Sequence, residues 1–323
     1  MFLSHDLLTA AIGLMMVVLL RSHLNWAARL GPRPFLWLAL GVILPLADYP
    51  LGLALTGNQA DMILGPLPFH SLFYSAGILG MGGLVVFLWN ESRFPWPQVI
   101  TTAAGLLGHQ LLMLTTPQGL PWLAPFSTQP ISLPLHPDGH PALALLLGLI
   151  LVLLEGFPHA WENLLRGAAA LTALYLLAGL GGYSLAWAHT RDWYPPQTQI
   201  DLEPATPLLT RWRVTATLEQ TYSSGFYTLG NPQAPAPEER ERWNNAPLLN
   251  TLLGNRVVSG FYYRVFKHPL ARVETTEGKL TLMMEELPSL GDTRTRAVLF
   301  WESNEEGNGG AVFTENLLGD FIP

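Results

Sequence analysis

Residues 71–90 read SLFYSAGILGMGGLVVFLWN, a stretch of twenty residues without a single Asp, Glu, Lys or Arg. At about 1.5 Å per residue, a helix of this length crosses the roughly 30 Å hydrocarbon core of a bilayer. The first 189 residues contain six apolar segments of this kind, at 7–20, 34–55, 71–90, 98–115, 141–155 and 167–189. The first and fifth are short, so either they extend over their flanks or one of them is re-entrant.

The few basic residues in this half of the chain indicate its orientation. Of the 17 Lys and Arg, only five precede residue 190, and they lie in the connections 21–33, 91–97 and 156–166. The connections 56–70 and 116–140 hold none. Because Lys and Arg are retained on the cytoplasmic side, this alternation predicts that both termini lie outside. The start lacks the basic n-region and cleavage site of a signal peptide, so we expect a retained first helix.

The composition changes near residue 190. Residues 190–323 hold 12 Lys and Arg against 17 Asp and Glu, and no run long enough to span a membrane. Segments rich in β-branched and aromatic residues predict strands at 212–220, 224–229, 257–266, 279–284 and 297–301. We therefore expect an α-helical membrane domain with about six transmembrane helices, residues 1–189, followed by a small β-rich extracytoplasmic domain, residues 190–323.

Charge and cysteine content exclude several classes of function. The acidic excess in residues 190–323 disfavours nucleic acid and anionic lipid surfaces as partners. The chain has no cysteine, which excludes disulfides, thiolate metal sites and cysteine nucleophiles. A Gly-rich phosphate loop, a G-x-S-x-G elbow and an H-E-x-x-H pair are absent from the sequence as well. The common signatures of soluble enzymes are therefore missing.

Four ionisable residues inside or at the ends of the apolar segments are the candidate metal ligands: His5, Asp48, His70 and His109. An ionisable group at membrane depth is costly unless it is paired, hydrated or bound, so it marks a functional site. His5 and His70 open their spans from the outer side. Counted along the helices, Asp48 lies about 21 Å and His109 about 16 Å from the cytoplasmic ends of their spans. All four fall toward the outer face, and zinc, manganese and iron accept imidazole and carboxylate ligands.

Each of these residues also has an ordinary structural interpretation. His5 and His70 are at helix ends, where histidines often cap a helix or sit at the membrane interface. Asp48 follows Pro45 and would satisfy backbone donors that the proline leaves unpaired. His109 would make an interhelical hydrogen bond. Only the depth that the four residues share favours a common site.

Short motifs in this order resemble those of the bacterial YdjM-like membrane-bound metal-dependent hydrolases. The matching segments of the membrane half are Ser4-His5, Leu44 to Pro50, Phe69 to Leu72, Gly105 to Gly119 and Pro125 to Ser127. Those of the second half are Pro207 to Leu209, Trp212 to Val214, Gly225 to Tyr227 and Tyr263 to Pro269. The resemblance therefore covers most of the chain and rests on order and spacing, since each motif is short.

The chain also departs from the family pattern. Leu46 and Met113 stand where that pattern has aspartates, and Gly65 and Pro66 replace its His-Arg pair. The family's ligand positions are retained at His5, Asp48, His70 and His109. Losing carboxylates leaves too little negative charge for two divalent ions, so the resemblance implies a single metal ion, which would be zinc, manganese or iron.

The function that the resemblance implies is hydrolysis at the outer face of the bacterial inner membrane. A metal-activated water would attack an ester or phosphoester of a lipid or envelope molecule. His136, Asp138 and His140 could supply a replacement ligand or a general acid. Pro137 and Gly139, however, make this segment typical of an ordinary turn, which is the interpretation we favour.

A second hypothesis is a membrane scaffold that has lost its chemistry and binds a protein partner through its outer β-rich domain. Membrane lipids are partners under both hypotheses. The small residues Gly179 to Gly182 would allow close helix packing within one chain or in a homo-oligomer. Transport fits less well, because no inverted repeat or pair of interrupted helices is visible.

Overall fold

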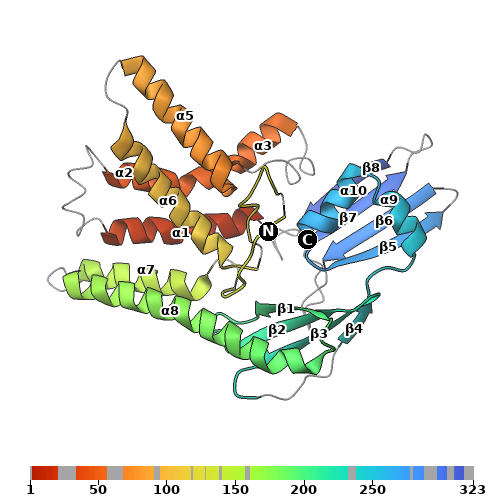
Figure 1. The fold of residues 1–323 in the computed structure, drawn as a ribbon. Helices are drawn as coiled ribbons and strands as arrows, with labels where there is room; N and C mark the ends of the chain where they lie inside the picture. The colour runs from red at the N-terminus through yellow and green to blue at the C-terminus, as the bar shows by residue number, and fades with distance from the viewer. Residues whose placement is uncertain are drawn as a thin grey trace.

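The computed structural model has a helical part followed by two antiparallel sheets (Figure 1). It describes residues 2–20, 34–56, 68–90, 95–117, 119–127, 129–137, 140–156, 161–231, 238–276, 279–286, 297–303 and 309–315. The long helices are α1 (Phe2–Leu20), α2 (Pro34–Ile43), α3 (Asp48–Thr56), α5 (Leu72–Asn90), α6 (Trp96–Leu114), α7 (Pro141–Gly156) and α8 (Trp161–Thr190). In the described part of the chain, the long helices therefore all precede the strands.

The segment predicted as one helix at 34–55 is broken in its middle. Helix α2 ends at Ile43, the 3-10 turn η2 spans Leu44–Ala47, and α3 begins at Asp48. Pro45 lies inside η2, and a proline has no N–H to continue an α-helical hydrogen-bond ladder. The break places Asp48 in the first turn of a new helix.

Two glycines allow α2 and α6 to touch backbone to backbone. A Cβ atom on Gly41 would lie well under 3.0 Å from the carbonyl oxygen of Thr102, and one on Gly105 would meet that of Leu38 as closely. Real Cβ atoms essentially never come this close, so glycine is required at both positions. This crossing fixes the position of α2 relative to α6, the helix that carries His109.

Helix α8 extends beyond the other helices and packs on the first sheet. This sheet has the order β1 (Gln199–Pro204), β2 (Arg211–Thr217), β3 (Thr221–Thr228) and β4 (Glu238–Glu241). Trp212 is fully buried against α8, where Gly182 leaves room for its indole ring. Ala186 of α8 belongs to the same apolar cluster as Trp212 and Leu202. The helical part and the first sheet thus share a core.

The second sheet has helices on one face (Figure 1). Its strands are β5 (Pro269–Thr276), β6 (Lys279–Glu286), β7 (Ala297–Ser303) and β8 (Gly309–Glu315), and the helices are α9 (Ala246–Leu252), α10 (Arg256–Gly260) and the π-helical turn η6 (Phe261–Val265). The predicted strands 279–284 and 297–301 lie within β6 and β7, and 212–220 and 224–229 overlap β2 and β3. The β-rich character of the second half is therefore confirmed.

The predicted strand at 257–266 is wrong, because this segment is helical. The Asn255 side chain caps α10 by accepting hydrogen bonds from the backbone N–H groups of Val257 and Val258. The buried residues Val258, Phe261 and Tyr262 recur at helical spacing in the core of the second sheet. Aromatic and β-branched residues suggested a strand here, but the cap and this core contact outweigh that preference.

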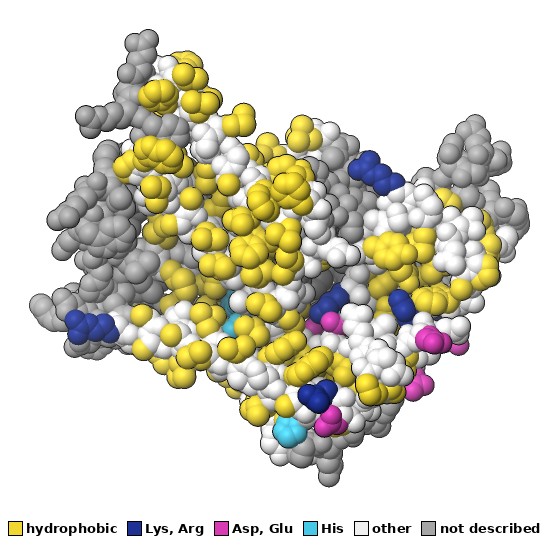
Figure 2. All heavy atoms as spheres, in the orientation of Figure 1, with side chains coloured by type: hydrophobic (Ala, Val, Ile, Leu, Met, Phe, Trp, Pro, Cys, Tyr) yellow, Lys and Arg dark blue, Asp and Glu magenta, His cyan; other side chains and the backbone are white. Residues whose placement is uncertain are grey.

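Three stretches within the described residues are long and apolar enough to cross a membrane, whereas the sequence predicts six. They are Leu36–Leu55, Leu72–Trp89 and Arg166–Trp193, and the apolar stretches Leu7–Val17 and Pro141–Ile150 are shorter. Helix α6 contains Thr, His and Gln side chains that lower its apolar character. Apolar side chains cover much of the visible face of the helical part, and charged ones gather on the β part (Figure 2).

Candidate functional site

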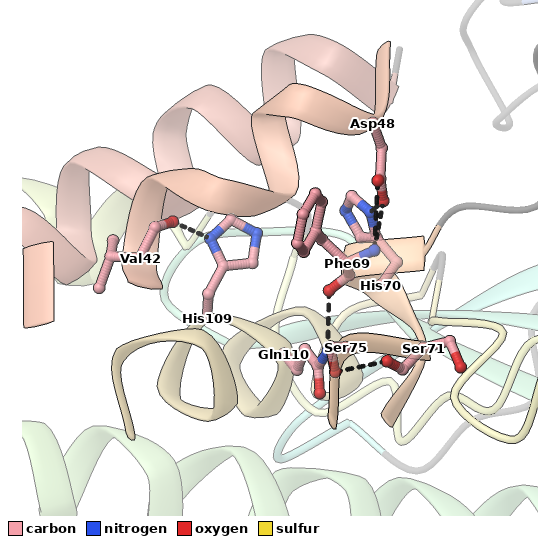
Figure 3. Close-up of polar contacts among 8 residues, drawn as sticks. All are labelled: Val42, Asp48, Phe69, His70, Ser71, Ser75, His109 and Gln110. Carbon is pink, nitrogen blue, oxygen red and sulfur yellow. Dashed lines mark hydrogen bonds and ion pairs between the residues drawn. The ribbon is translucent and has the colours of Figure 1, made fainter. Parts of the chain in front are cut away.

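Asp48 and His70 form a buried hydrogen-bonded pair between segments that are distant in the sequence. Asp48 is the first residue of α3, and His70 ends the 3-10 turn η3 (Pro68–His70). The Nδ1 atom of His70 lies 2.8 Å from Oδ2 of Asp48 (Figure 3). The two residues are only 2% and 1% exposed. A carboxylate that accepts from Nδ1–H orients the imidazole and makes Nε2 the metal-binding nitrogen, as in many histidine ligands.

The same carboxylate also holds the backbone of η3. The N–H of Phe69 donates to both oxygens of Asp48, over 3.2 and 3.0 Å. The N-terminus of α3 further stabilises negative charge at this position. These contacts favour a role for Asp48 in positioning His70, and its role as a direct metal ligand stays a prediction.

His109 on α6 points toward α2, where its Nδ1 atom lies 3.0 Å from the carbonyl oxygen of Val42 (Figure 3). A carbonyl oxygen only accepts, so Nδ1 of His109 carries a proton. The ring centroids of His109 and His70 are 6.0 Å apart, with the ring planes at 82°. Two neighbouring imidazoles therefore both have Nδ1 engaged by an acceptor.

Gln110 connects the elements around this pair and was not singled out from the sequence. Its Nε2 atom donates to the carbonyl oxygen of Phe69 over 2.8 Å, and its Oε1 atom accepts from the indole N–H of Trp122 over 3.0 Å. Ser71 extends the network by donating to the carbonyl oxygen of Ala124 over 2.5 Å. The buried amide of Gln110 thus holds η3 against α6 and the segment after it. Its position directly after His109 was the only signal in the sequence.

The structure brings three of the four sequence-predicted ligands into one neighbourhood. Asp48 contacts His70, and His70 packs edge to face with His109. The side chain of His5, in the first turn of α1, is outside the described part of the chain. Among the residues that are described, no three His, Asp or Glu side chains are arranged to hold a metal ion. A complete ligand set therefore remains a prediction.

Packed apolar side chains occupy two of the positions where the sequence departs from the YdjM-like pattern. Met113 is buried and accepts a hydrogen bond from the Thr9 hydroxyl over 3.3 Å. Leu46 packs against a buried apolar cluster formed by α1 and α2. Gly65 and Pro66 fall outside the described residues. At Met113 and Leu46, contacts between helices replace the carboxylates of the pattern.

His136 and His140, in the segment that precedes α7, are both fully buried. Burial, with a smaller contribution from His140, lowers the pKa of His136 to about 3. Burial also lowers the pKa of His140, although its hydrogen bond to the Leu112 carbonyl acts in the opposite direction. Both imidazoles are therefore neutral near pH 7. Asp138 and Gly139, between them, are not among the described residues.

A charged network joins the first sheet to the start of the second. Glu203 pairs with Arg213 and accepts from Lys267 Nζ over 2.9 Å, while His268 Nε2 lies 3.2 Å from Asp201 Oδ2. Burial alone would raise the pKa of Glu203, but the charges of Arg213 and Lys267 hold it well below its usual range. Burial alone would also raise the pKa of Asp201, but the hydrogen bond from His268 and the charge of Lys267 lower it.

Comparison with known proteins gives no family assignment. No protein-family model matches the chain, and no curated protein or solved structure matches it either. The resemblance to YdjM-like hydrolases accordingly stays a prediction from short motifs.

Proposed function

We propose that this protein is a membrane-embedded, metal-dependent hydrolase whose site is built on His70 and His109, with Asp48 orienting His70. The observation that carries the proposal is the buried hydrogen bond of 2.8 Å between Asp48 and His70 Nδ1. The proposed substrate class is an ester or phosphoester of a lipid or envelope molecule, and the proposed location is the outer side of the bacterial inner membrane.

The surface of the helical part supports a place in the membrane. Leu55 and Trp89 are each 85% exposed, and Met81 is 69% exposed. Apolar side chains exposed in such numbers are typical of a surface that contacts lipid or another protein. The proposed location of residues 190–323 on the outer side rests on the distribution of arginine between the connections.

The proposed ligands are those of a single divalent ion. His70 and His109 each use Nδ1 to donate to an oxygen, so Nε2 would bind the ion in both residues, and His5 is the third ligand that the sequence predicts. When bound, a divalent ion lowers the pKa of a coordinated water and supplies a nucleophile near neutral pH. Asp48 holds the His70 ring in one orientation, and the burial of both imidazoles limits competing water.

The proposal is tested by hydrolysis assays on zinc-loaded protein in lipid nanodiscs, with phospholipids and short-chain esters as substrates. Replacing Asp48 by Asn keeps the shape but weakens the orientation of His70, and we expect a rate loss of about 10- to 100-fold. Asp192→Asn is the matched control, since its side chain is 80% exposed and pairs with Arg191. Equal rates for wild-type protein and Asp48→Asn would contradict the proposal.

One observation favours a binding role without catalysis. The described residues contain no arrangement of three His, Asp or Glu side chains around a common point. In this alternative, Asp48, His70 and His109 stabilise the helix packing, and residues 190–323 recruit a protein partner. Wild-type protein that stays inactive and metal-free after metal loading would favour this alternative.

A further inference from the structure

His136, His140 and Tyr175 form a second buried group, which joins the segment before α7 to helix α8. His136 lies in the segment before α7, His140 directly precedes α7, and Tyr175 is on α8. The His136 ring stacks on Tyr175 with centroids 4.3 Å apart, and the two imidazole centroids are 5.3 Å apart. Both histidines are completely shielded from solvent. The group thus packs the segment before α7 against α8.

Most of the polar atoms in this group lack a hydrogen-bond partner among the described residues. They are Nδ1 and Nε2 of His136, Nδ1 of His140 and the hydroxyl of Tyr175. His140 Nε2 lies 3.0 Å from the carbonyl oxygen of Leu112, so Nε2 carries the proton and Nδ1 carries the lone pair. Buried polar groups in proteins are almost always satisfied, and leaving one unpaired costs about 1–3 kcal/mol. Four such atoms on three rings that contact one another indicate a missing ligand.

We propose that His136, His140 and Tyr175 bind one divalent transition-metal ion. Imidazole nitrogens and a tyrosine oxygen are ligands for such ions. One ion would satisfy the Tyr175 oxygen, Nδ1 of His140 and one nitrogen of His136, whose other nitrogen carries the proton. Two imidazoles that share a tetrahedral ion with metal–nitrogen distances of about 2 Å have ring centroids about 5 Å apart, close to the 5.3 Å between His136 and His140.

This site is separate from the one built on His70 and His109, and it does not depend on the proposed function. The described residues contain no grouping of three or more His, Asp or Glu side chains, so the two histidine pairs do not merge into one cluster. The ion would join the segment before α7 to α7 and α8, which is a structural role. A metal in this position needs no open coordination site.

Gly179 provides a way to disturb the site without removing a ligand. It lies one helical turn after Tyr175, and a Cβ atom there would come within 2.6 Å of His136 Nε2. Gly179→Ala therefore has to displace the His136 ring. Gly181→Ala is the matched control on the same helix, because nothing lies within 4 Å of its added Cβ.

The test measures binding of Co²⁺ and Zn²⁺ to full-length protein in detergent, in a His70→Gln, His109→Gln background that removes the first site. We expect about one equivalent of either ion and the intense visible absorption of tetrahedral Co²⁺. Adding His136→Gln and His140→Gln should lower the affinity at least 100-fold. Gly179→Ala should also weaken binding, and Gly181→Ala should leave it unchanged.

Further outcomes of the same binding experiment also support or overturn the proposal. Tyr175→Phe removes only the hydroxyl, so a changed Co²⁺ spectrum at full occupancy supports the phenol as a ligand. This variant keeps both histidines, so its result does not depend on whether the histidine variants fold. The proposal would be overturned if the His70→Gln, His109→Gln protein binds neither ion. It would also be overturned if adding His136→Gln and His140→Gln leaves the affinity for both ions unchanged. In that case ordered water fills the site.

Discussion

Replacing Gly105 by Ala should separate α2 from α6 and disturb the candidate site. A Cβ on Gly105 would meet the carbonyl oxygen of Leu38 well inside 3.0 Å and would lie 3.1 Å from the backbone nitrogen of Val42. Neither obstacle is the end of a flexible side chain, so the two helix backbones have to move. His109 lies one turn after Gly105 and hydrogen-bonds to the carbonyl of Val42, so the movement reaches the site directly.

The size of the effect follows from these contacts. Ordinary contact with a Cβ begins near 3.4 Å, so the helices must move apart by roughly 1 Å, and overpacking of this kind costs about 1–3 kcal/mol. Loss of the buried hydrogen bond from His109 to Val42 adds about 1 kcal/mol. We therefore expect Gly105→Ala to lower the free energy of unfolding by about 2–4 kcal/mol.

Gly108→Ala is the matched control. It makes the same chemical change on the same helix, but nothing lies within 4 Å of the added Cβ. Alanine is the better helix former by up to about 1 kcal/mol, so the control should be neutral or stabilising. The assay is reversible unfolding in mixed micelles followed by tryptophan fluorescence. Equal effects of Gly105→Ala and Gly108→Ala would refute the close crossing of α2 and α6.

Two further predictions concern the second half of the chain. Asn255→Ala removes the side-chain cap of α10 and should cost about 1 kcal/mol in thermal unfolding, while the exposed Asn250→Ala should have little effect; equal changes would contradict the cap. Acid should loosen the network of Asp201 and Glu203, because the pKa values of both carboxyl groups are lowered in the folded state. The stability that these groups contribute is present above about pH 4, where carboxyl groups titrate in the unfolded chain. It is lost as the pH falls through the pKa values of the folded state. Fluorescence during acid titration should show a weaker pH dependence for Glu203→Gln than for wild-type protein, and identical profiles would argue against the network.

The sequence predicts where the helices lie, because long apolar runs have few alternative structures. It overestimates how many described helices are long and apolar enough to cross a membrane. The strands β2, β3, β6 and β7 were also predictable, since their aromatic and β-branched residues form the cores of the two sheets. The prediction of a strand at 257–266 was wrong because aromatic and β-branched residues can be buried equally well at helical spacing. What decided its structure was the Asn255 cap, a single polar side chain.

The site could be predicted only in part. Depth along the helices, counted from the constant rise per residue, placed Asp48, His70 and His109 at a similar level, and in the structure Asp48 contacts His70, which packs against His109. Depth cannot say which atoms meet, so the orientation of His70 by Asp48 and the contact of His109 with Val42 were not foreseen. These contacts depend on the break at Pro45 and on the close crossing at Gly41 and Gly105.

The measurement that tests the central claim most directly is the zinc content of purified protein whose second site has been removed by His136→Gln and His140→Gln. With His109 intact, about one equivalent of zinc should be retained after loading and gel filtration. Adding His109→Gln should abolish this retention while the tryptophan fluorescence of the folded state is kept. Protein that holds no zinc with His109 intact, or holds as much after His109→Gln, would contradict a metal site built on His70 and His109.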